Sequence, residues 1–187
     1  MISKLSREFA LKTEPERREA YADMLLSPVM HTDCTNGREK GKSCQIYVCA
    51  TPDGKALYFA REKKGHEGVK GTVTEDYQGI LVHDHDITFY NYGADHQECL
   101  AHMLRYLKDS MDNEPNRAWN KDMIPGYLLT NNEAERLLRN YKRKQAQAVT
   151  FRSFESIDYL CQCMSMLVLM RLEEPANIFD RVSRIFG

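Results

Sequence analysis

Three short β-forming segments follow one another early in the chain, and they constrain the fold more than any other feature. They span residues 29–33, 43–51 and 56–60. A polar segment at 35–42 separates the first two, and Pro52-Asp53-Gly54 separates the second from the third. Proline, aspartate and glycine favour tight turns because each suits a turn backbone conformation. The sequence therefore predicts an antiparallel meander of three strands.

A fourth strand is predicted at residues 79–82, where apolar side chains lead directly into His83-Asp84-His85-Asp86. A short apolar run that ends in acidic residues is typical of a buried strand that carries carboxylates at its C-terminal end. Open α/β sheets place their sites at that end. The alternative is a strand followed by a solvated polar turn. A fifth short strand is expected at residues 99–101.

Helical patterns flank these strands. Apolar residues recur at helical spacing in residues 1–26, 103–111, 137–141 and 154–168. Thr130 and Glu133 form a capping-box arrangement ahead of the third of these helices. The polar segment between the third and fourth strands contains three glycines, so at most one helical turn is expected there. Strands and helices together predict the α/β (α+β) class, with helices flanking the sheet.

Composition limits the classes of protein that this chain can belong to. Its 187 residues suffice for one domain with its own core. The formal net charge of −1 gives no overall field that attracts nucleic acid, so any such surface must come from local clusters. The six cysteines include no C-x-x-C pair, which argues against a disulfide framework and favours buried thiols in a reducing compartment. Without an apolar signal or spanning segment, a cytoplasmic location is expected.

Three acidic residues stand where converging elements would bring them together. Asp33 ends the first predicted strand, Asp84 follows the fourth, and Glu135 lies in the first turn of the capped helix. Carboxylate oxygens suit Mg²⁺ or Mn²⁺, and two such ions can activate an attacking oxygen and stabilise a leaving oxygen of a phosphodiester. The alternative is that each acid is an ordinary turn or cap residue.

Basic residues follow the third acid along the same helix. They are Arg136, Arg139, Lys142, Arg143 and Lys144, and the loop residues Lys63 and Lys64 form a weaker second group. Such clusters can contact the phosphate backbone of DNA. The alternative for both groups is a solvated charged face.

Histidine and cysteine residues also lie near the second acid. Cys99 and His102 have a spacing compatible with zinc, but the sequence offers no matching second pair. We therefore expect these two residues, together with His83, to orient the carboxylates or to pack in the core.

Four motifs in this order resemble the bacterial DDE transposases of the insertion-sequence sixty-six family. They are His31-Thr32-Asp33-Cys34-Thr35, Val82-His83-Asp84-His85, residues 99–107 with the Cys-x-x-His element, and Asn131-Asn132-Glu133-Ala134-Glu135-Arg136-Leu137-Leu138-Arg139. The resemblance covers about residues 28–172. It implies a ribonuclease-H-like mixed sheet, an Asp, Asp, Glu metal triad with two Mg²⁺ (or Mn²⁺) ions, and DNA strand cleavage and strand transfer at transposon ends.

Matching the motifs residue by residue assigns the triad to Asp33, Asp84 and Glu135, in preference to Asp86 and Glu133. Arg105, within the third motif, is expected to support the site. The resemblance also implies DNA as partner, transposon ends and target alike, with a homo-oligomer or a longer transposase as a further partner. It implies a bacterial, nucleoid-associated location.

This chain departs from the family in length. Relatives carry an N-terminal DNA-binding region and a long helical insertion. In place of the insertion, this chain has only residues 112–130. We expect a helical leader or remnant at 1–27, a catalytic core at 28–172 with the insertion largely deleted, and a tail at 173–187. Two alternatives follow: a non-catalytic transposase-derived remnant with residual DNA binding, and a stand-alone metal-dependent nuclease of the same fold.

Overall fold

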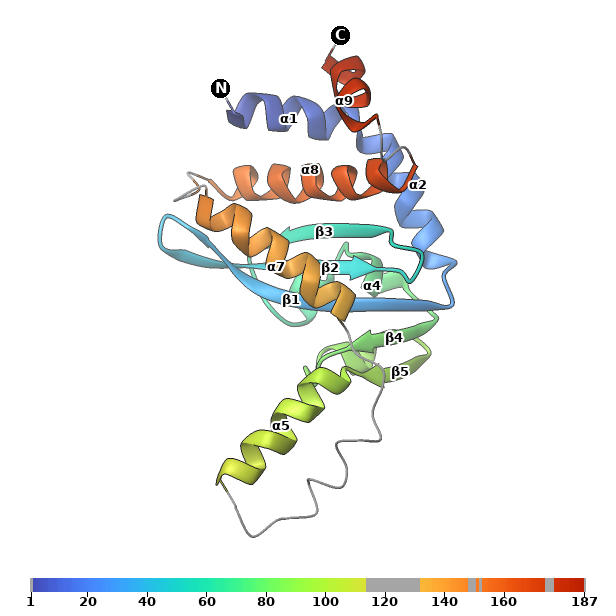
Figure 1. Cartoon of the computed structure of the whole chain (residues 1–187), viewed down its shortest axis with the longest axis vertical. Coiled ribbons are helices and arrows are strands. Elements are labelled where there is room, and N and C mark those ends of the chain that lie inside the picture. The colour runs from blue at the N-terminus through green and yellow to red at the C-terminus, as the bar shows by residue number, and fades with distance from the viewer. Residues whose placement is uncertain (1, 114–131, 148–150, 152, 174–176, 187) are drawn as a thin grey trace.

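A single mixed β-sheet organises the molecule (Figure 1). The computed structural model describes residues 2–113, 132–147, 151, 153–173 and 177–186. The strands are β1 (Val29–Glu39), β2 (Lys42–Ala50), β3 (Ala56–Arg61), β4 (Ile80–His83) and β5 (Asp95–Glu98), and their spatial order is β3-β2-β1-β4-β5. β1, β2 and β3 pair antiparallel, which confirms the predicted meander, while β4 and β5 run parallel to β1. This mixed sheet agrees with the predicted α/β (α+β) class.

The first hairpin is longer than its sequence suggests. The prediction of a polar turn over residues 35–42 was wrong, because β1 continues to Glu39 and the chain reverses at Lys40 and Gly41. Both turn residues have positive φ, +45° and +84°, as a tight two-residue hairpin turn requires. The polar side chains before the turn pair across the ladder, where Gln45 Nε2 donates to Asn36 Oδ1 at 2.8 Å. The polar composition of residues 35–39 conceals a strand that is recognised by its pairing with β2.

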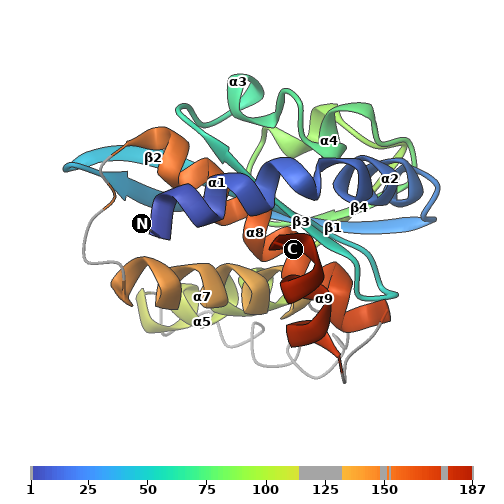
Figure 2. The same ribbon diagram turned by 90° about the horizontal axis from the view of Figure 1, so that it is seen from above.

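Strand β2 is buried on both faces and divides the core in two. Tyr47 and Cys49 face one apolar cluster, and Ile46 and Val48 face the other. Helix α8 (Phe154–Glu173) contributes to both clusters, and α7 (Asn132–Gln147) packs on the second (Figure 2). A strand buried on both faces appears in sequence as a nearly continuous apolar run, as residues 44–50 do.

The N-terminal helical segment belongs to the same packed body. It forms two helices, α1 (Ile2–Lys12) and α2 (Glu14–Leu25), with Phe9 and Met24 buried. α1 lies along α8 in Figures 1 and 2. Within the segment 173–187, α9 (Ile178–Phe186) stacks Phe186 on Phe9, with ring centroids 6.0 Å apart.

Two further predictions need correction. Residues 99–101 do not form the fifth strand, because Cys99 precedes α5 (Leu100–Asn113) and the fifth strand lies at Asp95–Glu98. That edge strand is entirely polar, so it carries no apolar signal in the sequence. Short helices also occur in the glycine-containing segment, α3 (His66–Val69) and α4 (Val73–Asp76), and a 3-10 turn, η1, spans Phe89–Asn91.

Some predictions fall outside the described residues. These are the capping threonine Thr130 and most of the connection at 112–130. Within the part of the chain that the structure describes, no helix has the length and apolar character needed to cross a membrane.

Candidate active site

A cleft of about 340 Å³ opens where β1, the end of β4, α5 and α7 meet. The three carboxylates singled out from the sequence all contribute to its wall. The lining residues are Asp33, Cys34, Thr35, Asp84, His102, Arg105, Glu135, Leu138, Arg139 and Lys142. Strands supply two of the acids and a helix supplies the third, so the fold gathers residues that are a hundred positions apart in the chain.

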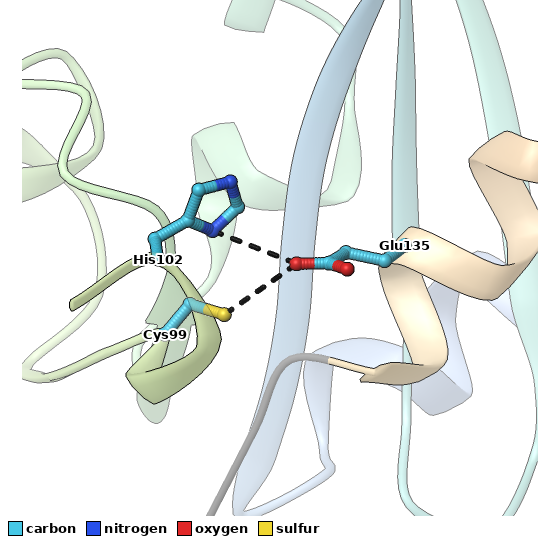
Figure 3. Close-up of side chains that lie close together, drawn as sticks. All are labelled: Cys99, His102 and Glu135. Carbon is cyan, nitrogen blue, oxygen red and sulfur yellow. Dashed lines mark hydrogen bonds and ion pairs between the residues drawn. The ribbon is translucent and has the colours of Figure 1, made fainter. Parts of the chain in front are cut away.

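The helix-borne acid, Glu135, is held by side chains of α5. Its Oε1 lies 3.6 Å from His102 Nδ1 and 3.8 Å from Cys99 Sγ (Figure 3). The same oxygen lies 3.1 Å from a terminal guanidinium nitrogen of Arg105. The Glu135 side chain is 18% exposed. The neighbouring acid, Glu133, instead forms an ion pair with Arg136. Glu135 is therefore the acid of this helix turn that belongs to the cleft.

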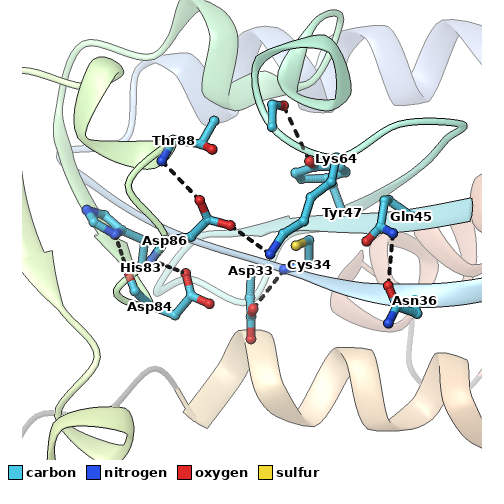
Figure 4. Close-up of polar contacts among 11 residues, drawn as sticks. Asp33, Cys34, Asn36, Gln45, Tyr47, Lys64, His83, Asp84, Asp86 and Thr88 are labelled. Carbon is cyan, nitrogen blue, oxygen red and sulfur yellow. Dashed lines mark hydrogen bonds and ion pairs between the residues drawn. The ribbon is translucent and has the colours of Figure 1, made fainter.

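The strand-borne acids sit side by side because their strands are parallel neighbours. His31 on β1 pairs with Val82 on β4, and Asp33 and Asp84 each stand two residues further along. Asp33 is 7% exposed, and its Oδ1 accepts a hydrogen bond from the backbone N–H of Cys34 at 2.7 Å. Figure 4 shows its carboxylate on the side of the sheet that faces α7.

The electrostatics of Asp33 indicate an excess of negative charge. Burial, followed by the Asp84 carboxylate, raises the pKa of Asp33 to about 7. Glu135 acts in the same direction, while the Cys34 N–H and Arg105 offset only part of the effect. Crowded carboxylates of this kind are relieved by a proton or by a cation.

Asp84 and Asp86 have different surroundings although they are two residues apart. Asp86 Oδ2 accepts from Lys64 Nζ at 2.9 Å and its Oδ1 accepts from the Thr88 N–H at 3.0 Å (Figure 4). Burial would raise the pKa of Asp86, but these hydrogen bonds outweigh it and lower the pKa. The Asp84 side chain accepts from the Asp86 N–H at 3.1 Å and lines the cleft.

His83 fixes the backbone that presents Asp84. Its ring is fully buried, and burial lowers its pKa, so the ring is neutral. A carbonyl oxygen can only accept, so His83 Nδ1–H donates to the carbonyl of Asp84 and Nε2 accepts from His96 Nδ1 at 3.2 Å. His96 lies on β5, so the edge strand supports the site. In the sequence, the only sign of a supporting role for His96 was its position near other histidines.

The basic residues of α7 divide between two faces of the helix. Arg139 and Lys142 follow Glu135 by four and seven residues and line the cleft with it. Lys142 Nζ also donates to the Asn36 carbonyl. Arg136, Arg143 and Lys144 are exposed and are not among the cleft-lining residues that the structure describes.

The two loop lysines have separate surroundings. Lys64 is engaged by Asp86, and Lys63 lines a different hollow with Phe154. Cys34, Thr35 and Leu138 line the cleft without having been predicted to do so, because only the fold shows which side chains border it.

Two thirds of this chain match a known protein family. A family model described as "Transposase IS66 family" matches residues 1–125, two thirds of the chain. The chain belongs to the transposase IS66 family. The matched residues include Asp33, Asp84 and the segment from Cys99 to Arg105, and they end before Glu135. They also begin earlier than residue 28, so α1 and α2 lie within the family match.

Two further comparisons complete these findings. No curated protein matches this chain. Among solved structures, a chain from "CryoEM structure of simian T-cell lymphotropic virus intasome in complex with PP2A regulatory subunit B56 gamma" is similar at 12% identity and a TM-score of 0.33. The similarity covers 59% of this transposase-family chain and 47% of that chain.

Proposed function

We propose that this chain is the catalytic domain of a DNA transposase, in which Asp33, Asp84 and Glu135 hold divalent metal ions for strand cleavage and strand transfer. One observation carries the proposal: three carboxylates from β1, from the end of β4 and from α7 line a single cleft. If the three acids served only to form structural ion pairs, each would need a cationic partner. Apart from histidine contacts, the ion pair between Arg105 and Glu135 is the only one that any of the three acids forms among the described residues.

The donor set fits the metal that the family implies. Carboxylate oxygens are the ligands that Mg²⁺ and Mn²⁺ prefer. The raised pKa of Asp33 supports the fit, because burial and then the neighbouring Asp84 disfavour its charged form, and a bound cation would stabilise that form. When bound, two such ions would activate the attacking oxygen and stabilise the leaving oxygen of a phosphodiester.

The other residues of the cleft have roles that follow from their positions. Arg139 and Lys142 face the same cleft as the acids, where their charges can bind the phosphates that flank the scissile bond. Arg136, Arg143, Lys144, Lys63 and Lys64 would extend this contact to phosphates further along the DNA. His83 holds the backbone of Asp84, while Cys99, His102 and Arg105 hold Glu135.

The proposal extends to partners and organisation. The substrate is DNA, both transposon ends and target, and the chain acts as a homo-oligomer or with a longer transposase, in the bacterial cytoplasm at the nucleoid. Residues 28–172 form the catalytic core with its helical insertion largely deleted, while 1–27 and 173–187 flank it. The packing of α1 and α9 on α8 supports a structural role for both flanks.

A DNA cleavage assay in Mg²⁺ tests this function. The test protein is the wild-type chain, and the comparison is the triple variant Asp33→Asn, Asp84→Asn, Glu135→Gln. The matched control is the double variant Asp86→Asn, Glu133→Gln, which removes the neighbouring acids that are already engaged by Lys64 and Arg136. We expect cleavage by the wild type and the control and none by the triple variant. Equal cleavage by all three would refute the assignment.

A second candidate is favoured by one contact. Arg105 and His102 both contact Glu135 Oε1. Such contacts are expected of a non-catalytic remnant in which the third acid has only a structural role. Such a chain would bind DNA without cutting it. DNA binding by the wild type without cleavage, together with metal affinity equal to that of the triple variant, would favour this candidate.

A further inference from the structure

We propose that Cys99, His102 and Glu135 form a second metal site, suited to Zn²⁺ or a related transition-metal ion, at the α5 side of the cleft. One ligand atom from each residue lies within 4.8 Å of the others. The proposal goes beyond the transposase function and does not depend on it, although the two sites share Glu135.

Two of the three separations between the ligand atoms match those of a tetrahedral zinc site. Zinc bonds of 2.0–2.3 Å place tetrahedral ligand atoms about 3.3–3.8 Å apart. Glu135 Oε1 lies 3.6 Å from His102 Nδ1 and 3.8 Å from Cys99 Sγ. Figure 3 shows both side chains of the α5 turn directed at the same carboxylate oxygen. These distances are too long for good hydrogen bonds but accommodate an ion between the three atoms.

Burial provides an independent argument. His102 Nδ1 is inaccessible to solvent and has no hydrogen-bond partner among the described groups. A buried nitrogen without a partner costs free energy unless something else binds it. Cys99 is 1% exposed, with its sulfur directed at Glu135. A metal ion would satisfy the nitrogen and the thiolate at once.

The backbone fixes two of the ligands before any ion binds. The His102 N–H donates to the Cys99 carbonyl at 3.0 Å, so both residues sit on one turn at the start of α5. The third ligand comes from α7, across the cleft. The sequence offered no second Cys/His pair, and the fold supplies a carboxylate in its place. Only the packing of α5 toward α7 reveals this set of ligands.

The chemistry of the donors selects the metal. A thiolate with an imidazole suits Zn²⁺, whereas Mg²⁺ prefers oxygen ligands alone. Thiolate and carboxylate together balance the double positive charge, and three protein ligands leave one position for water. Arg105 is the competing cation at Glu135, but its side chain is 56% exposed and can turn to solvent when an ion binds.

The test uses Co²⁺ as a spectroscopic probe on the full chain. Thiolate ligation gives a charge-transfer absorption band that Zn²⁺ should abolish by displacement. We expect the band in the wild type, its loss in Cys99→Ser, and at least tenfold weaker Co²⁺ binding in His102→Gln and Glu135→Gln. Cys34→Ser is the matched control, because Cys34 is a thiol in the cleft lining outside the proposed ligand set, and it should keep the band. Circular dichroism confirms folding of each variant.

The outcomes separate this inference from the transposase proposal. A wild-type chain without the band, or a band that survives Cys99→Ser and disappears in Cys34→Ser, would overturn the zinc site and leave the function untouched. Asp33→Asn should keep the band while losing Mg²⁺ binding. If Cys99→Ser does not fold, His102→Gln decides: unchanged Co²⁺ affinity in that variant overturns the site.

Discussion

The strand-borne and helix-borne halves of the cleft are held in place by different means. Asp33 and Asp84 follow the paired part of β1 and β4, so the parallel register of these strands places them, and His83 holds the backbone of Asp84. Glu135 is positioned by the packing of α7 and then by His102 and Arg105 of α5 and by Cys99, which precedes α5. The contrast teaches that the two aspartates are built into the sheet, whereas the glutamate depends on a second layer of residues.

The two halves also differ in charge. The strand half carries acids that burial and mutual repulsion disfavour, as the pKa of Asp33 shows. The helix half carries Glu135 together with Arg105, Arg139 and Lys142, which compensate it. Under the proposed function, a divalent ion would therefore have its largest electrostatic effect at the strand half. Variants in either half of the cleft can test this difference.

The largest effect is expected from Asp84→Asn. Loss of a metal ligand should exceed the 10–100-fold loss typical of residues behind the ligands, so cleavage should fall by more than about 100-fold. The fold should persist, because the backbone register does not depend on this carboxylate. Cleavage rates measured beside Asp86→Asn check the prediction. Similar losses in both variants would mean that Asp84 has no special role.

The pH dependence of stability tests the charge of the strand half directly. The pKa of Asp33 is raised in the fold from 3.8 to about 7, so the folded state favours the protonated acid. The resulting stability is fully present below pH 4 and is lost as pH rises through 7. Without metal, the wild type should lose about 2–4 kcal/mol relative to Asp33→Asn between pH 4 and pH 8.

Denaturant unfolding in a chelator, on both proteins across that range, provides the measurement. Mg²⁺ should reverse the loss in the wild type at pH 8 and leave Asp33→Asn unaffected. Parallel stability curves for the two proteins would show that Asp33 is ionised without penalty, and the case for a metal at the strand half would lose its electrostatic support.

Disturbing the second layer should have a smaller effect than removing a ligand. Arg105→Ala removes the cation 3.1 Å from Glu135 Oε1, and residues that orient ligands typically contribute 10–100-fold. We expect cleavage to fall about tenfold, with partial rescue in Arg105→Lys because the positive charge returns. Rates at saturating Mg²⁺ are the readout. A loss as large as that of Asp84→Asn would erase the distinction between the two halves.

The smallest effect is expected at the phosphate contacts. Lys142→Ala should weaken DNA binding and reduce the slope of log affinity against log salt by about 1, since each lysine that binds a phosphate releases about one counterion. Lys55→Ala is the control, because Lys55 is paired with Asp23 and lies outside the cleft lining that the structure describes. Equal slopes for the two variants would show that DNA does not enter the cleft along this face.

The sequence predicts one part of this structure better than the other. The meander was accessible because β-forming runs end at tight turns, and Asp33 and Asp84 were accessible because each follows an apolar strand pattern. The strand structure of residues 36–39 and of β5 was not predicted, because these segments are polar. Only their pairing with neighbouring strands identifies them as strands.

The contact between α5 and Glu135 could not be derived from spacing. It joins residues more than thirty positions apart across a connection with no periodic pattern. Motif resemblance pointed to Glu135, but the convergence of Cys99 and His102 on its Oε1 comes from tertiary packing, which local patterns do not contain.

Calorimetric titration of Mg²⁺ and of Mn²⁺ tests the central claim most directly. It compares the wild-type chain with the triple variant Asp33→Asn, Asp84→Asn, Glu135→Gln. We predict saturable binding by the wild type, weaker below pH 7 where Asp33 is protonated, and no binding by the variant. Indistinguishable titrations of the two proteins would mean that the carboxylates do not assemble a metal site, and would contradict the account.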